Sequence, residues 1–223
     1  MDVTTGPGFW STIRKKPDSF ILIHYSCQSL YDDNEGLSPR ITSIAVQYYA
    51  TDQTVSFSTH AIAEELHIPR EEVSDRFDEI EKHLLQKFAQ FVSERKNKYW
   101  VHWNMRNLTY GFEHIQHRYA VLIDQNFPVI PVERRVKLND MLAQRYGSDY
   151  AQDPRMLRLM ETNGERPRQF LTGEEEVTAF RNNEFIKMHN STLAKIGFFS
   201  SVIKKALAGK LRTDSSGVGV WLD

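Results

Sequence analysis

The order of two hydrophobic patterns is what most constrains the fold of this chain. Three short segments rich in apolar and β-branched residues come first, at positions 20–23, 41–49 and 54–58. The first is a continuous apolar run, which is typical of a strand buried on both faces. From position 77 the apolar residues recur at spacings of three and four, the pattern of an amphipathic helix. The sequence therefore predicts three strands in an antiparallel meander, followed by a helix.

Strands and helices alternate in the second part of the chain. We expect strands at 99–103 and 128–132 and helices at 77–92, 108–122, 136–146 and 185–207. Thr172 and Glu175 have the spacing of a capping box, which predicts a further helix start. A meander followed by such alternation predicts an α/β fold with a mixed sheet and helices on both faces. We divide the chain into an arm at 1–18, a domain at 19–208 and a tail at 209–223.

The composition restricts the compartment and the partners that we expect for this protein. The single cysteine, Cys27, excludes an internal disulfide and favours a reducing compartment. The formal net charge of −1 means that nucleic-acid binding would need a local basic patch. No apolar run is long enough to span a membrane, and the first residues lack the pattern of a signal peptide. We therefore expect a cytoplasmic protein without a membrane partner.

Chemically versatile side chains gather at positions 100–119, where a predicted strand leads into a helix. His102 and Asn104 share one face of that strand by the two-residue period. His24 ends the first strand, which we expect to lie beside it. Two histidines and an arginine can cleave RNA without metal, as base, acid and phosphate-binding cation. The predicted catalytic set is His24, His102, Asn104 and Arg106.

Each of these residues also has a structural interpretation. His24 is a candidate general base or phosphate contact, and equally a satisfied strand-end histidine. Arg106 at the helix start could meet an anion with the free amides there, or form an ordinary salt bridge. His114 and His117 are three apart on the helix, but no third ligand is evident, so we predict no metal and no cofactor. The predicted nucleic-acid-binding set is Arg106, Tyr110, His117 and Arg118.

Three short segments resemble the motifs of the DEDD-type 3′–5′ exonucleases, which have a ribonuclease-H-like fold. The segment at 20–30, FILIHYSCQSL, aligns without gaps on the first motif and matches its apolar run and its final leucine, Leu30. His24 stands at the position of the motif's Asp, and Ser26 at the position of its Glu. The resemblance implies a ribonuclease-H-like mixed sheet over about residues 20–205.

The other two motifs match in the same partial way. Positions 101–104 resemble the second motif, but Leu108 replaces its Asp; His189 fits the third, where Ala194 replaces the Asp. Exonucleases of this family hold two divalent ions between four carboxylates. The residues at the four acidic positions here, His24, Ser26, Leu108 and Ala194, carry no carboxylate. The resemblance therefore implies a degenerate acidic site. The segment at 175–195 also resembles uncharacterised bacterial proteins, which implies no activity.

Three functions follow from these observations. The leading hypothesis is a nucleic-acid- or nucleotide-associated protein on an exonuclease-like scaffold with a degenerate acidic site. The first alternative is a metal-independent nuclease or phosphodiesterase that uses His and Arg. The second is a protein–protein interaction module whose pseudo-site is structural.

Overall fold

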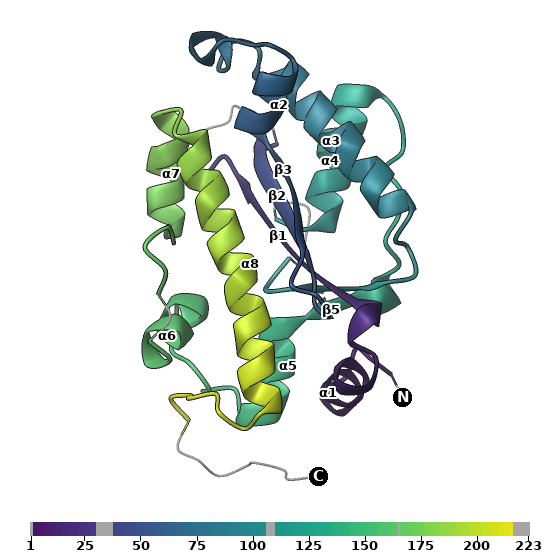
Figure 1. Cartoon of the computed structure of the whole chain (residues 1–223), viewed down its shortest axis with the longest axis vertical. Coiled ribbons are helices and arrows are strands. Elements are labelled where there is room, and N and C mark those ends of the chain that lie inside the picture. Colours follow the sequence, from purple (N-terminus) through teal and green to yellow (C-terminus); the bar gives the residue numbers. More distant parts are fainter. Residues whose placement is uncertain (1, 30–37, 106–109, 165, 216–223) are drawn as a thin grey trace.

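Five strands form one mixed sheet in the computed structural model, which describes residues 2–29, 38–105, 110–164 and 166–215 (Figure 1). The strand order is β3-β2-β1-β4-β5. Antiparallel pairing joins β1 to β2 and β2 to β3, and parallel pairing joins β1 to β4 and β4 to β5. The strands are β1 (Phe20–Cys27), β2 (Ile41–Tyr48), β3 (Thr54–Ser58), β4 (Tyr99–His102) and β5 (Arg135–Lys137). The predicted α/β class with a mixed sheet is confirmed.

Helices cover both faces of the sheet (Figure 1). Side chains alternate along each strand, so one face of β1 presents Ile21 and Ile23 to the core beneath α3 and α4. The other face presents Phe20 and Leu22 to the core that includes α1, α5 and α8. The helices are α1 (Gly6–Lys15), α2 (Thr59–Glu65), α3 (Phe77–Ser93), α4 (Phe112–Ile123), α5 (Leu138–Tyr146), α6 (Arg155–Thr162), α7 (Gly173–Arg181) and α8 (Phe185–Leu207).

The longest helix, α8, crosses the sheet over β1 and β2. Its apolar stripe packs on the strands and is almost completely buried, with Ile196, Phe199, Val202 and Ile203 at 0–1% exposure. β1 is buried at all eight positions, as its continuous apolar run predicted. The polar residues of β1 therefore need partners within the protein, because water does not reach them.

The segment predicted as an N-terminal arm contains helix α1. Phe9 and Ile13 are completely buried, and the backbone N–H of Gly6 donates to Oε1 of Gln144 on α5 at 2.7 Å. A proline in the first turn suits a helix start, because its missing N–H would have no helical partner there. Glycine is a poor helix former, so the glycines on either side of that proline do not indicate this helix within the arm predicted at 1–18.

The strand predicted at 128–132 is wrong. The strand that pairs with β4 at this edge of the sheet is β5, which begins at Arg135, three residues after the end of the predicted strand. Pro128 and Pro131 lack a backbone N–H, which disfavours a strand between them. The predicted helix start at 108 and residues 216–223 of the predicted tail lie outside the described residues. Within the described ranges, no helix is long and apolar enough to span a membrane.

Candidate polar site at the end of strand β1

His24 lies on the face of β1 that packs against α8. Its ring meets that of Phe199 edge-on at 5.7 Å between centroids, and its Nδ1 lies 3.3 Å from the hydroxyl of Tyr110. Only 7% of the residue is exposed. Burial, reinforced by the nearby charge of Lys195, holds the pKa of His24 well below its usual range. His24 is therefore a neutral, enclosed imidazole at neutral pH.

His102 ends β4 on the opposite face of the sheet. Its register partner on β1 is Ile23, and register partners on parallel strands share a face, so His24 points the other way. The ring of His102 contacts Phe112, and its Nδ1 accepts the backbone N–H of Met105 at 2.9 Å. The predicted convergence of His24 with His102 is wrong, because the relative register of the two strands could not be read from the sequence.

Of the remaining members of the predicted catalytic set, the structure describes only Asn104. Asn104 follows β4 and is exposed. Arg106 lies outside the described residues. Tyr110 donates its hydroxyl to the carbonyl of Tyr25 at 2.8 Å and stacks on that ring at 4.4 Å between centroids. Tyr110 therefore fastens the segment before α4 to β1, and its ring is not presented to a base.

The two residues predicted to bind nucleic acid from α4 have opposite environments. His117 is exposed, as a binding residue should be. Arg118 is 6% exposed, and its guanidinium forms two hydrogen bonds with Glu81 on α3, which is completely buried. Glu81 also accepts the backbone N–H of Ile41 at 2.9 Å. This burial argues against the predicted nucleic-acid contact for Arg118, because the cation neutralises a core carboxylate.

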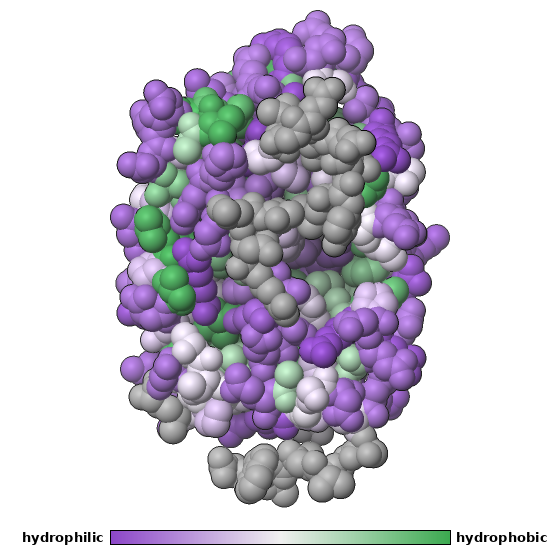
Figure 2. All heavy atoms as spheres, turned by 180° about the vertical axis from the view of Figure 1, so that it is seen from behind, coloured by the Kyte–Doolittle hydropathy of each residue, from purple (hydrophilic) through white to green (hydrophobic). Residues whose placement is uncertain are grey.

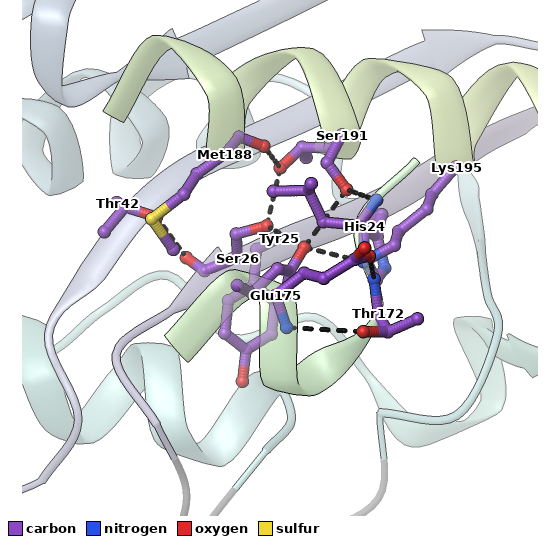
Figure 3. Close-up of polar contacts among 12 residues, drawn as sticks. His24, Tyr25, Ser26, Thr42, Thr172, Glu175, Met188, Ser191 and Lys195 are labelled. Atoms are coloured by element: carbon purple, nitrogen blue, oxygen red, sulfur yellow. Dashed lines mark hydrogen bonds and ion pairs between the residues drawn. The ribbon is translucent and has the colours of Figure 1, made fainter. Parts of the chain in front are cut away.

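A polar network that the sequence interpretation missed lies where β1 meets α7 and α8 (Figure 3). Three donors converge on Oε1 of Glu176: the hydroxyl of Ser26 at 3.1 Å, the hydroxyl of Ser191 at 3.2 Å and the ammonium of Lys195 at 2.6 Å. The hydroxyls of Ser26 and Thr192 lie 2.8 Å apart. We call these five residues the strand-end network.

Local sequence explains how the network assembles. The predicted capping box is confirmed: Thr172 and Glu175 bond reciprocally and fix the start of α7, which carries Glu176. Lys195 lies four residues after Ser191 and three after Thr192 on α8, so its side chain is on the same side of the helix as both. Ser26 points toward α8 because it lies two residues after His24 on β1 and therefore shares the face of the strand that packs against that helix. The helical spacing of the three α8 residues was the available signal.

The network is enclosed and electrically balanced. Lys195 is 6% exposed, and the Glu176 side chain is 16% exposed. The ammonium also lies over the ring of Phe170, 5.2 Å from its centroid. Neighbouring Cys27 is buried, and burial raises the pKa of its thiol. The hydroxyl groups and the ammonium bond to one another and to Glu176. The arrangement is therefore suited to holding β1, α7 and α8 together.

Other buried histidines have protein partners as well. His189, which aligns with the third exonuclease motif, lies with its Nδ1 2.8 Å from the hydroxyl of Ser43 on β2. His114 lies with its Nδ1 2.9 Å from the hydroxyl of Tyr25 and its Nε2 2.8 Å from the carbonyl of Pro39. Across the described part of the chain, no three His, Cys, Asp or Glu residues are grouped as metal ligands would be.

Comparison with known proteins gives no relative from which a function could be transferred. No family model matches the chain, and no curated protein or solved structure shows significant similarity to it. The functional argument therefore depends on this chain's own residues.

Proposed function

We propose that this chain is a nucleic-acid- or nucleotide-associated protein, built on a ribonuclease-H-like, exonuclease-like scaffold whose acidic site has become structural. One observation carries the proposal. Ser26, which aligns with an acidic position of the exonuclease motif, shares Oε1 of Glu176 with Lys195. A lysine ammonium thus compensates the network's one carboxylate.

The sheet supports the scaffold part of the proposal. A three-stranded antiparallel meander is extended on the β1 side by two parallel strands, β4 and β5. That connectivity is compatible with a ribonuclease-H-like fold. Polar side chains gather at the carboxyl end of β1, where open α/β sheets commonly bind ligands. The fold alone does not imply an activity, so the proposal is limited to association.

Metal-independent hydrolysis receives less support. The mechanism considered from the sequence needs an acid and a base on the same substrate, yet His24 and His102 lie on opposite faces of the sheet. His24 is also enclosed between Phe199 and Tyr110. Neither imidazole is placed to share a phosphate with the other.

A protein–protein interaction module remains the second candidate, because several large apolar side chains are exposed. Val129 and Val132 are 61% and 72% exposed, and Val121 on α4 is 58% exposed. Figure 2 shows a mostly hydrophilic rear surface on which hydrophobic areas are small and separated. Scattered apolar residues of this kind are common on monomeric proteins, so this candidate ranks second.

Fluorescence anisotropy with labelled single-stranded DNA and RNA tests the proposal. We expect saturable binding that weakens as salt rises, since phosphate contacts release counterions. Measurements at about 50 and 200 mM salt give the slope of the logarithm of the binding constant against the logarithm of the salt concentration. No binding to either strand or to mononucleotides at low salt would refute the proposal and favour the interaction module.

A further inference from the structure

A basic groove lies beside the strand-end network, between the amino-terminal end of α8 and the short turn Arg70–Glu72. Its volume is about 390 Å³, within the range of roughly 300–1,000 Å³ that is usual for small-molecule sites. Its lining combines cationic, amide and aliphatic side chains: Arg70, Arg168, Gln169, Leu171, Glu184, Ile186, Lys187 and Asn190.

We propose that this groove binds the phosphate of a nucleotide, either a free mononucleotide or the terminal nucleotide of a single strand. The inference rests on the proposed function and names its ligand class and its site. The groove differs from the predicted catalytic set: among that set's described residues, none of His24, His102 and Asn104 lines it.

Charge is the first argument. Arg70 and Arg168 are exposed, and neither forms an ion pair with any carboxylate in the parts of the chain that the structure describes. Lys187 bonds Glu184 at 3.2 Å, but both side chains are more than one-third exposed, so this pair is weak. Three cations and one carboxylate leave the lining with an excess positive charge. Guanidinium groups suit phosphate because they present paired N–H donors in a plane.

The uncharged lining is the second argument. Ile186 is 57% exposed, and with Leu171 it offers an aliphatic surface for a base or ribose. Gln169 and Asn190 carry amides that both donate and accept, as recognition of base edges requires. A site for a bare anion would need neither group. The volume suits one nucleotide, which favours a mononucleotide or a strand end over the middle of a strand.

The walls of the groove are held in place by buried contacts. The N–H of Leu171 donates to the hydroxyl of Ser191 at 3.0 Å, so the strand-end network fixes the loop that carries Arg168. Phe185 begins α8 and packs against the rings of Phe77 and Phe180, at 5.5 and 5.9 Å between centroids. Such preorganisation reduces the entropy lost on binding. The strand-end network would thus hold one wall of the groove in place without contacting the ligand.

Isothermal titration with 5′-AMP, adenosine and inorganic phosphate tests the inference, using the wild type and Arg70→Ala/Arg168→Ala. We expect 5′-AMP to bind at least about tenfold more tightly than adenosine or phosphate alone. We expect the double variant to lose about tenfold or more in affinity for 5′-AMP, which corresponds to about 1.4 kcal/mol. The same pair of proteins is then titrated with a 5′-phosphorylated oligonucleotide and its 5′-hydroxyl form. Discrimination between those two forms would identify strand ends as a source of the ligand.

Arg14→Ala/Lys15→Ala is the matched control, because it removes the same charge from α1, away from α7 and α2 (Figure 1). Equal affinity for 5′-AMP in the wild type and Arg70→Ala/Arg168→Ala would overturn the inference and leave the proposed function standing. An equal loss in the control would also overturn it, because only net charge would then matter. No binding of any probe by the wild type would remove the proposed function itself.

Discussion

Substitution of Lys195 by methionine isolates the charge at the centre of the strand-end network. Methionine keeps most of the aliphatic stem beside Phe170 but removes the ammonium that bonds Glu176 at 2.6 Å. The largely enclosed Glu176 would then keep only the hydroxyls of Ser26 and Ser191 on Oε1. The variant therefore measures what the lysine contributes to holding the network together.

The expected loss follows from the burial of the pair. Removing one partner of a buried ion pair costs about 3–5 kcal/mol. The Glu176 side chain is 16% exposed and keeps two hydrogen bonds, so we expect the lower end, about 3 kcal/mol in the free energy of unfolding. Replacing both members, as in Lys195→Met/Glu176→Leu, removes the orphaned charge and should recover much of that loss.

Urea unfolding followed by tryptophan fluorescence and circular dichroism provides the measurement. Lys87→Met is the control, because Lys87 pairs with Glu65 at a similar distance while both side chains are about half exposed. We expect that control to lose less than about 1 kcal/mol. The reasoning would be refuted if Lys195→Met were no less stable than Lys87→Met, or if the double variant were less stable than Lys195→Met alone.

Three further predictions concern groups around the network and the core. Burial lowers the pKa of His114 and of His189 to about 4, below the ordinary 6.5, so the unfolded chain binds protons first as pH falls. The free energy of unfolding, measured by urea titration at each pH, should be highest above pH 6.5. It should fall by on the order of 2 kcal/mol per histidine by pH 5, and a profile that does not change with pH would contradict this. Burial raises the pKa of the Cys27 thiol, so a thiol reagent should modify it only as the protein unfolds; rapid labelling of the folded protein would count against its enclosure. Thr172→Ala should cost about 1 kcal/mol by removing the α7 cap, whereas Thr178→Ala, within the same helix, should cost less in the same urea assay.

Much of the fold was predictable because local patterns reported it directly. The apolar run of β1, the helical spacing of α3 and the capping box of α7 each depend on neighbouring residues. Two elements were not predicted correctly, because their local residues are typical of another structure. Gly6 and Gly8 disfavour a helix where α1 forms, and the apolar residues Val129, Ile130 and Val132 beside two prolines resembled a strand.

The candidate site was less predictable because it depends on pairing between distant segments. A shift of one residue in strand register reverses the face that a side chain occupies, and this separates His24 from His102. Glu176 and Ser26 are 150 positions apart, and nothing local to either one indicates their contact. Arg118 looked like a surface cation because its partner, Glu81, belongs to a different helix.

We propose that the strand-end position, where the exonuclease motif has its acidic residues, is structural in a protein that binds nucleic acid or nucleotides. The most direct test of this proposal is one incubation that measures binding and cleavage of labelled single- and double-stranded DNA and RNA, with Mg²⁺, Mn²⁺ or EDTA. The wild type is compared with His24→Ala and His102→Ala. We expect binding without cleavage in every condition. Metal-dependent cleavage, or cleavage in EDTA that either histidine substitution abolishes, would contradict it.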